Sequence, residues 1–546
     1  MGESSAHPVS AGAQLADEGV FLRKASGLIK TASATDVFFF NLGLVSIGIA
    51  LALTQLYGAA FYPGGSLWGG SALATVIMVP IAITFSLLTM TYPRSGGLYV
   101  YLSRVFGPFV GYTFSFAESA ILLSYGALAA TYVTTMGVAP MFATLGAVTG
   151  NSTLSQWGTD LTGHGGEFII GTSVIVLGGI LLISGMAKYF AVQRVLLAVA
   201  VLGTILTLIL LVAYSRGSLI THFNSLMRGQ VGGNAYQKEI THAKAAGWRN
   251  PGFDFGQTVK LLVWPLLALL GSIQSIGIGG EIKNVNRNQW VGMLGALLGS
   301  GLLLVVIAVL SVRAFGYDFM GAVAYNTLNA DPKFTPAITP FFTFLASLVV
   351  YSPVLVLVIT ATFAIWPFFW VPLELAYVDR SLLVWALDRM APDRVGYVDE
   401  RLHTPVVAIV IVTAVAEIFL ALFVFTPWFG TLSLIEGLSL IWGTAMVAAA
   451  LLPYLKPDVW SKSPASNYRL FGLPLITVIG TVATVAFAFV IYLLWTDPIA
   501  AGHTTPSVLW QIGIFVGGAV LYAITRYFRQ RQGLNVSFAF KDIPVE

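Results

Sequence analysis

The chain has 546 residues, of which 57% are hydrophobic and only 10% are charged, whereas soluble domains carry roughly 25% charged residues. This composition excludes an ordinary soluble protein and predicts an integral membrane protein. The absence of cysteine excludes disulfides, thiolate catalysis and cysteine-ligated metals, and the six histidines form no ligand-spaced pair. We therefore expect no metal site and no cofactor.

Apolar runs of about 20 residues, the length that a helix needs to cross a bilayer, recur along the whole chain. They predict an all-α polytopic membrane protein with twelve transmembrane helices, at 34–57, 69–92, 108–138, 166–187, 191–214, 257–281, 290–314, 337–370, 404–426, 429–453, 472–496 and 507–528. The third and the eighth are long enough to tilt or to contain a break. Residues 1–22 are polar and lack an apolar segment behind a basic start, so no cleaved signal peptide is expected.

The net charge of +4 gains meaning when lysine and arginine are sorted by membrane side, because cytoplasmic loops are enriched in both. With the N-terminus inside, the inner segments hold 20 of the 28 lysines and arginines. The long outer loop 215–256 is expected to cap the outer face. Both tails, 1–30 and 531–546, are therefore predicted to be cytoplasmic, and the protein is expected in the plasma membrane.

The chain also divides into two halves of similar size, helices 1–5 (31–214) and helices 6–10 (257–453). Each half opens with a glycine-interrupted helix, FNLGLVSIGIAL at 40–51 and LLGSIQSIGIGG at 269–280. An odd number of helices per half turns the second half upside down relative to the first. Paired breaks at matching positions are typical of transporters with a site near the bilayer midplane. We predict a five-plus-five inverted repeat, with helices 11 and 12 (454–530) peripheral.

The glycines and serines of the sixth helix allow a second interpretation, a small-residue face on which another helix packs. Each glycine in a helix costs about 1 kcal/mol relative to alanine, and in lipid a freed backbone group has no water to pair with. A break that lines a cavity avoids this cost, since the exposed amides and carbonyls then bind a solute. The matching break in the first helix favours the cavity.

Three segments of the predicted inner face carry family motifs. The first is Tyr92-Pro93-Arg94-Ser95-Gly96-Gly97-Leu98-Tyr99 with Gly107-Pro108, the second is Gly280-Glu281-Ile282-Lys283-Asn284, and the third runs from Asp379-Arg380 to Thr404-Pro405-Val406. They resemble, in this order, the "PRSGG-x-Y…GP", "GEVKNP" and "SR…A…DG-x-x-P…TP" stretches of the amino acid–polyamine–organocation (APC) transporter superfamily. Val285 stands where the family has proline. The resemblance covers residues 30–500.

This resemblance implies a LeuT-like fold in which helices 1, 3, 6, 8 and 10 surround an amino-acid-like substrate. The substrate carboxylate would meet amides of broken helix 1, and its ammonium would meet carbonyls of helices 1 and 6. By position, the implied contacts are Gly43, Ser46, Ile47, Gly48, Leu269, Leu270, Gly271 and Ser272. The family has closely spaced glycines in helix 1, whereas four residues separate Gly43 from Gly48 here.

Side chains near the breaks indicate the chemical class of the substrate. Leu269, Leu270 and Ile273 surround the helix 6 break without an acid or a base, which favours a neutral, apolar amino acid. Glu118 stands alone in the apolar third helix, and an ionisable residue at membrane depth is a functional hypothesis by default. It would carry a coupled proton or face a cationic substrate; alternatively, it is a protonated acid bonded between helices. Tyr125 shares its helix face and would line the same cavity.

Other polar residues suggest coupling and gating. Some proton-driven relatives carry a lysine in helix 5, but Ala200 stands there, so that mechanism is not expected. Sodium would use hydroxyls of helix 8, Thr360 and Thr362. Inner-face charges would form an ion-pair gate, or else serve as ordinary positive-inside anchors: Arg94, Glu281, Lys283, Asp379, Arg380 and Asp388. Glu417 and Glu436 are assigned to packing or to the rim of the cavity.

We interpret the chain as a secondary active transporter that imports neutral amino acids by alternating access, coupled to H⁺ in preference to Na⁺ or simple exchange. The alternatives are a polyamine or cationic amino acid exchanger, and a nutrient sensor on a transporter scaffold. An enzyme is not expected, because the sequence shows no nucleophile–base pair, metal-ligand cluster or phosphate loop. The expected partners are a small-molecule substrate, the coupling ion and the lipid bilayer, without nucleic acid.

Overall fold

The computed structural model describes residues 26–534, 536 and 540. Most of the predicted tails 1–30 and 531–546 therefore lies outside the described residues, as do the charges of Arg23, Lys24 and Lys541. Within the described part, twelve helices are long and apolar enough to cross a membrane, as the sequence predicted. An interrupted first span, α2 (Ala34–Val45) and α3 (Ile47–Phe61), opens the series.

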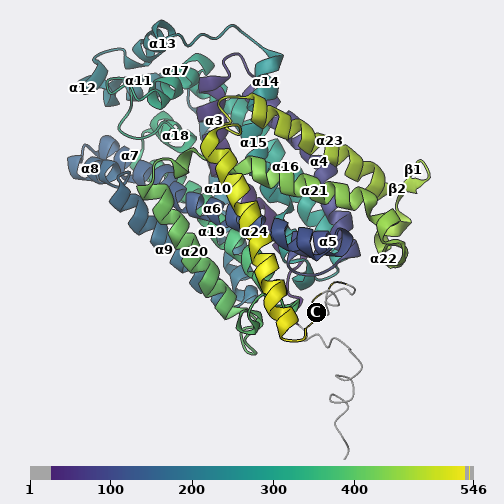
Figure 1. Ribbon diagram of the computed structural model, residues 1–546. Coiled ribbons are helices and arrows are strands. Elements are labelled where there is room, and N and C mark those ends of the chain that lie inside the picture. The colour runs from purple at the N-terminus through teal and green to yellow at the C-terminus, as the bar shows by residue number, and fades with distance from the viewer. Residues whose placement is uncertain (1–25, 535, 537–539, 541–546) are drawn as a thin grey trace, which may run out of the picture.

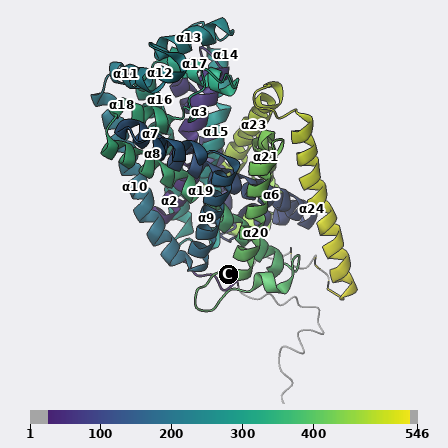
Figure 2. The ribbon, with the colours of Figure 1, turned by 90° about the vertical axis from the view of Figure 1, so that its left-hand side faces the viewer.

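The remaining spans follow in chain order. They are α4 (Leu67–Thr91), α6 (Pro108–Tyr132) with η1 (Val133–Val138) and α7 (Ala139–Thr149), α9 (His164–Ile183), α10 (Met186–Ala213), α14 (Phe255–Leu261) with α15 (Val263–Leu269) and η2 (Leu270–Gly277), α16 (Val285–Phe315), α19 (Pro353–Leu387), α20 (Val406–Phe425), α21 (Leu434–Leu455), α23 (Leu475–Thr496) and α24 (Thr505–Arg531). Figure 2 shows α24 at the edge of the bundle.

Short elements connect the spans. They are α5 (Gly97–Val105), α8 (Ser152–Asp160), α11 (Arg216–Leu226), α12 (Arg228–Val231), α13 (Ala235–Ala245), η3 (Gly279–Glu281), α17 (Tyr317–Leu328), α18 (Phe342–Val350), η4 (Asp393–Gly396), η5 (Phe429–Thr431), α22 (Pro457–Lys462), η6 (Pro464–Asn467), β1 (Arg469–Leu470) and β2 (Leu473–Pro474). The two strands form an antiparallel hairpin in which Arg469 pairs with Pro474.

The eighth helix differs from its prediction at 337–370. The apolar run there belongs to two elements, because α18 ends at Tyr351, whose φ is 43°, and α19 begins at Pro353. Proline fits the first turn of a helix, where its missing N–H costs nothing, and it holds the preceding residue extended. The eighth span therefore reaches Leu387, and it includes Asp379 and Arg380, which the sequence had suggested for a loop.

The third helix, predicted to tilt or to contain a break, contains one. Its middle unwinds into the π-helical η1 at Val133–Val138 before continuing as α7. Pro140 follows at once, and its lack of an N–H removes one bond from the regular ladder. A π-turn at this point is a common way for a long helix to bend.

Four short helices, α11, α12, α13 and α17, form a cap over one end of the bundle, as Figures 1 and 2 show from two directions. Trp248 fixes the cap to the first span, because its indole N–H donates to the carbonyl of Ala59. It also lies against Gly321, where an added Cβ would come within 2.1 Å of the Trp248 ring. The loop 215–256 thus covers one end of the bundle.

An acidic cluster lies inside this cap. The Glu239 side chain is buried, and its Oε2 accepts a hydrogen bond from the Asn326 amide at 2.6 Å. Burial raises the pKa of Glu239 to about 8, with Asp331 acting in the same direction and the Asn326 bond opposing it. His242 faces the same group, with its Nε2 lying 3.2 Å from Asp331 Oδ2.

The raised pKa of Glu239 predicts that the cap loses stability in base. A carboxyl whose pKa rises from 4.5 to about 8 on folding holds its proton more tightly in the folded state, so stability falls as the pH rises through this window. We expect the thermal midpoint of the wild type to drop below that of Glu239→Gln between pH 5 and pH 9. A midpoint difference that stays constant over this range would contradict the assignment.

Candidate functional site

The two interrupted helices meet at their breaks. α2 ends at Ser46, which adopts a left-handed conformation with φ 45° and ψ 78°, and η2 is a 3₁₀ helix that continues the sixth span after α15. The Asn41 amide donates to Ser275 Oγ at 3.0 Å and accepts from the Ser275 N–H at 2.9 Å. These two bonds hold one break against the other. The break predicted in the first helix is therefore confirmed, and the break predicted in the sixth takes the form of a change from α-helix to 3₁₀ helix at Leu270.

Gly271 lies where the backbones come closest. A Cβ on this residue would stand 2.3 Å from the carbonyl carbon of Leu44 and 2.6 Å from the amide nitrogen of Val45. Neither backbone atom can move aside without shifting α2. Glycine is thus required at this position for the two breaks to touch, which explains the residue type on steric grounds.

Two hydroxyls beside the breaks have no partner among the described residues. Ser46 and Ser272 are both fully buried, and the oxygen of each is unbonded. Ser46 gives no side-chain cap to α3, and the first amides of a helix have no acceptor within it. The junction therefore presents unpaired hydroxyls at the positive end of a helix dipole, a setting that favours an anion.

The other implied contacts lie in the same region but are packed. A Cβ on Gly43 would meet Leu373 at 2.8 Å, and one on Gly48 would meet Trp366 at 3.3 Å. These glycines therefore allow α19 to approach the first span closely. Three further residues of the implied set have side chains that are buried at the junction: Ile47, Leu269 and Leu270.

A cavity of about 330 Å³ lies on the cap side of the junction. Its aromatic residues come from α3, α6, α15, α19 and α20. The lining within the described chain contains no charged side chain: Leu53, Tyr57, Tyr125, Leu128, Tyr132, Val263, Trp264, Leu267, Trp370, Phe423, Gly430, Thr431, Leu432, Ser433, Leu434, Ile435, Leu494, Ile499, Ala500 and Ala501. Tyr57 stacks on Trp264 at 4.5 Å, and Tyr125 stacks on Trp370 at 6.0 Å. Tyr125 thus lines this cavity, whereas Glu118, which was expected to share it, is not among its lining residues.

Glu118 lies about two helical turns from Tyr125 on α6, away from the cap. Its side chain is buried, and its Oε1 accepts from the Tyr377 hydroxyl at 2.9 Å and from the Trp442 indole at 2.6 Å. Its Oε2 has no partner among the described residues. Glu118 therefore connects the third, eighth and tenth spans through one oxygen and leaves the other free.

A second buried acid, Glu374, escaped the sequence analysis. Its Oε1 accepts from the Trp370 indole at 2.7 Å and from the Gln274 amide at 3.3 Å, so it lies beside the helix 6 break. The predicted end of helix 8 at residue 370 left Glu374 in a loop, although the stretch WVPLELAY is otherwise apolar. The expectation of a neutral substrate assumed that no acid lies near this break, and the fold removes that assumption.

The opposite end of the junction is closed by buried charges. Arg380 donates to Glu281 at 2.9 Å and to Asp379 at 2.6 Å, and the side chains of all three are buried. A second buried pair joins Arg104 to Asp388 at 2.8 Å. Three of the proposed gate residues therefore form one ion-pair cluster, and Asp388 belongs to a separate pair.

The remaining gate candidates lie outside this cluster. The Lys283 side chain is exposed, and Arg94 is half-buried, with its guanidinium donating to the carbonyl of Pro93. The motif around Arg94 contributes through its backbone instead, because the Gly96 N–H donates to the Gly277 carbonyl at 2.9 Å. Gly96 has φ 88°, a conformation that glycine adopts without strain. The backbone thus reinforces the closure.

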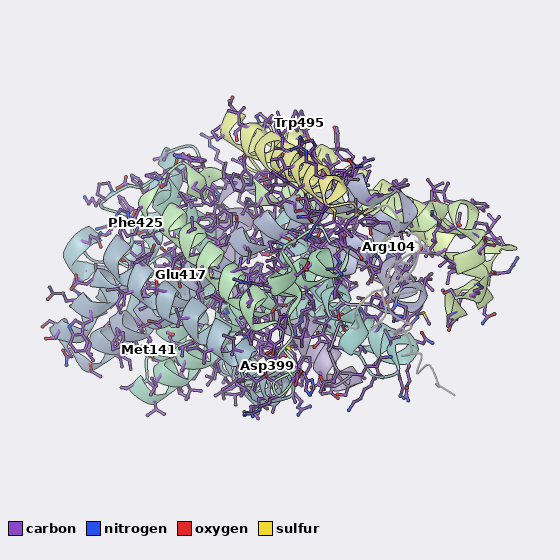
Figure 3. The ribbon with its side chains drawn as sticks, turned by 60° about the horizontal axis from the view of Figure 1, so that its bottom comes forward. Arg104, Met141, Asp399, Glu417, Phe425 and Trp495 are labelled. Carbon is purple, nitrogen blue, oxygen red and sulfur yellow. The ribbon has the colours of Figure 1, made fainter. Side chains whose placement is uncertain are left out.

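The suggested sodium ligands are turned toward other partners. Thr362 packs on α10, where a Cβ on Gly203 would come within 2.2 Å of its hydroxyl. The Thr360 hydroxyl donates to the carbonyl of Val356 on its own helix. Glu417 accepts from Thr172 at 3.0 Å, and Figure 3 shows it on α20, well apart from Arg104.

Comparison with known proteins identifies the family to which the chain belongs. A family model described as amino acid permease matches residues 33–520, which include both breaks, both buried acids and the ion-pair cluster. No curated protein matches the chain.

The close approach at Gly271 predicts that a single methyl group is harmful there. Gly271→Ala would push Cβ into the backbone of α2, and overpacking of this kind costs about 1–3 kcal/mol. We expect a lower thermal midpoint and loss of amino acid uptake in proteoliposomes. Gly299→Ala is the matched control, because a Cβ on Gly299 meets nothing within 4 Å; equal uptake by the two variants would show that the contact is dispensable.

Proposed function

Because this chain belongs to the amino acid permease family of the APC superfamily, we propose that it moves amino acids across the cell membrane as a secondary active transporter, by alternating access. The family implies a transporter rather than an enzyme. The observation that carries the mechanism is the junction of Ser46 and Gly271, where two helices break side by side between an aromatic cavity and a buried ion-pair cluster.

In this proposal the halves 31–214 and 257–453 form an inverted repeat, with 454–530 peripheral to it. The cap faces the outside, since the end of the bundle that holds Arg380 also carries most of the lysine and arginine. The aromatic cavity is then the outer vestibule. The cluster of Glu281, Asp379 and Arg380, whose side chains are paired and buried, is the inner gate of this proposal.

The substrate carboxylate binds the first amides of α3, beside the free hydroxyl of Ser46. An amino acid that leaves water must find a partner for each charge, because burying an unpaired ion costs several kcal/mol. The unpaired amides meet this need for the carboxylate. Carbonyls of the 3₁₀ helix η2 and the hydroxyl of Ser272 receive the ammonium. Backbone amides and carbonyls at the helix ends thus pair with both charges of the substrate, and no charged side chain is needed.

Proton coupling through Glu118 is the second part of the proposal. Its carboxyl lies between α6, α19 and α21, the spans that must move relative to one another, and one of its oxygens is unpaired. Loss of its proton creates a buried charge that Tyr377 and Trp442 stabilise only in part. The protonation state of Glu118 therefore biases the packing of these three helices.

Proton coupling predicts the pH dependence of transport. Glu118→Gln keeps the volume and the hydrogen-bonding oxygen but removes the titratable proton, so we expect uptake into proteoliposomes to lose its dependence on an inward proton gradient. Glu417→Gln serves as the matched control, since it removes a membrane carboxyl that bonds to Thr172 on the flank of the bundle. A Glu118→Gln variant with the wild-type pH profile would leave Glu118 a structural residue.

The inner gate predicts an opening when its cluster is weakened. Removal of one partner from a buried ion pair costs about 3–5 kcal/mol, so Glu281→Gln should shift the population toward the inward-open state. The chain has no cysteine, so Ser272→Cys provides a single label site. We expect labelling from the Arg380 side to rise several-fold in Glu281→Gln and to stay constant in the control Lys283→Gln. Equal labelling in both would exclude this gate.

A further inference from the structure

Glu374 places a buried carboxyl group beside the helix 6 break, and the proposed transport mechanism does not use this group. We propose that Glu374 binds a positively charged side-chain group, an alkylammonium or a guanidinium, so that the transported amino acid is cationic. This inference rests on the proposed function and narrows its substrate class.

The geometry places Glu374 between the cavity and the break. Trp370 lines the aromatic cavity and lies one turn before Glu374 on α19, and its indole N–H holds Glu374 Oε1. Gln274 reaches the same oxygen from η2. The other oxygen, Oε2, is buried without a partner among the described residues, as is the Gln274 carbonyl oxygen. Two buried acceptors without donors thus lie beside the helix 6 break.

The charges around this site do not balance. Between α6, α19 and the helix 6 break, the described chain buries four carboxyl groups, those of Glu118, Glu281, Glu374 and Asp379, against the single guanidinium of Arg380. Arg380 is taken by Glu281 and Asp379. The cation of Arg104 is matched by Asp388. Neither Glu118 nor Glu374 has an ion-pair partner among the described residues, so the site lacks positive charge.

The two unpaired acids differ in what surrounds them. Both accept two hydrogen bonds on one carboxyl oxygen, but Glu118 lies about two helical turns from Tyr125, away from the vestibule. Glu374 is held from the cavity side by a tryptophan whose ring stacks with Tyr125. Aromatic faces attract cations, and the vestibule offers Tyr57, Trp264, Tyr125 and Trp370 with no basic side chain to repel one. A cation that enters the vestibule therefore meets aromatic rings first and Glu374 next.

A neutral, apolar side chain fits this place less well. It would leave Glu374 Oε2 and the Gln274 carbonyl oxygen without donors, and a buried acceptor left unpaired weakens the complex. A lysine-like or arginine-like side chain supplies donors to both oxygens and charge to the carboxylate. Its own α-carboxylate and α-ammonium remain for the helix breaks.

The test compares two ligands that differ by one ammonium group, lysine and norleucine. Binding to the purified full-length chain is measured by thermal shift, and transport is measured by competition with labelled lysine in proteoliposomes. We expect the wild type to prefer lysine over norleucine by about tenfold or more, the ratio that corresponds to about 1.4 kcal/mol. Glu374→Gln should lower the affinity for lysine by a similar factor and leave the affinity for norleucine nearly unchanged. The control Glu417→Gln should keep the wild-type preference for lysine.

The outcomes separate the two proposals. A wild type that binds and transports norleucine or leucine as well as lysine would overturn the role of Glu374 and leave amino acid transport standing. A chain that binds none of the twenty amino acids would overturn the proposed function, and this inference with it. Norleucine binding by Glu374→Gln would show that the variant is folded. A loss of binding that is restricted to lysine would then report on the carboxylate of Glu374 alone.

Discussion

The close contact between two interrupted helices is the constraint on which the rest of the structure depends. Gly271 touches the backbone of Leu44 and Val45, and Asn41 bonds to Ser275 across the same junction. Helices in lipid must satisfy their own backbone groups, so a break is tolerated only where a partner or a solute replaces the lost bonds. Here each break gives the other a polar neighbour. The unpaired hydroxyls of Ser46 and Ser272 are what this arrangement leaves over for a ligand.

The eighth span, α19, connects this junction to both the aromatic cavity and the buried ion-pair cluster, the two ends of the proposed pathway. Trp366 packs against Gly48, Trp370 lines the vestibule, Glu374 reaches the helix 6 break, and Arg380 belongs to the buried cluster on the far side. A rotation of this one helix would therefore alter the vestibule, the acid beside the break and the ion pairs together. Buried ion pairs add little net stability but strongly resist separation, which suits a gate that must be either shut or open.

The sequence predicted the parts of the fold that depend on local pattern. Long apolar runs located the spans, and the glycine and serine density at 40–51 and 269–280 located both breaks, because each pattern has a local physical cause. The eighth helix was misplaced because two apolar elements follow one another and only Pro353 marks the boundary. That error hid Glu374. Lys283 and Arg94 were assigned to the gate as charges of the predicted inner face, whereas the Lys283 side chain is exposed and the Arg94 guanidinium donates to the carbonyl of Pro93.

What local pattern does not provide is the balance of charge in three dimensions. Glu118 is visible in the sequence as a lone acid, but its partners Tyr377 and Trp442 lie more than 250 residues away along the chain. Glu374 matters because Arg380, the nearest buried cation on its own helix, is already paired by Glu281 and Asp379. A carboxyl in a low-dielectric site acquires either a proton or a cation. Glu118 does not line the aromatic cavity, so a proton is its proposed partner, whereas Glu374 lies beside Trp370 and the helix 6 break, where a cation is proposed.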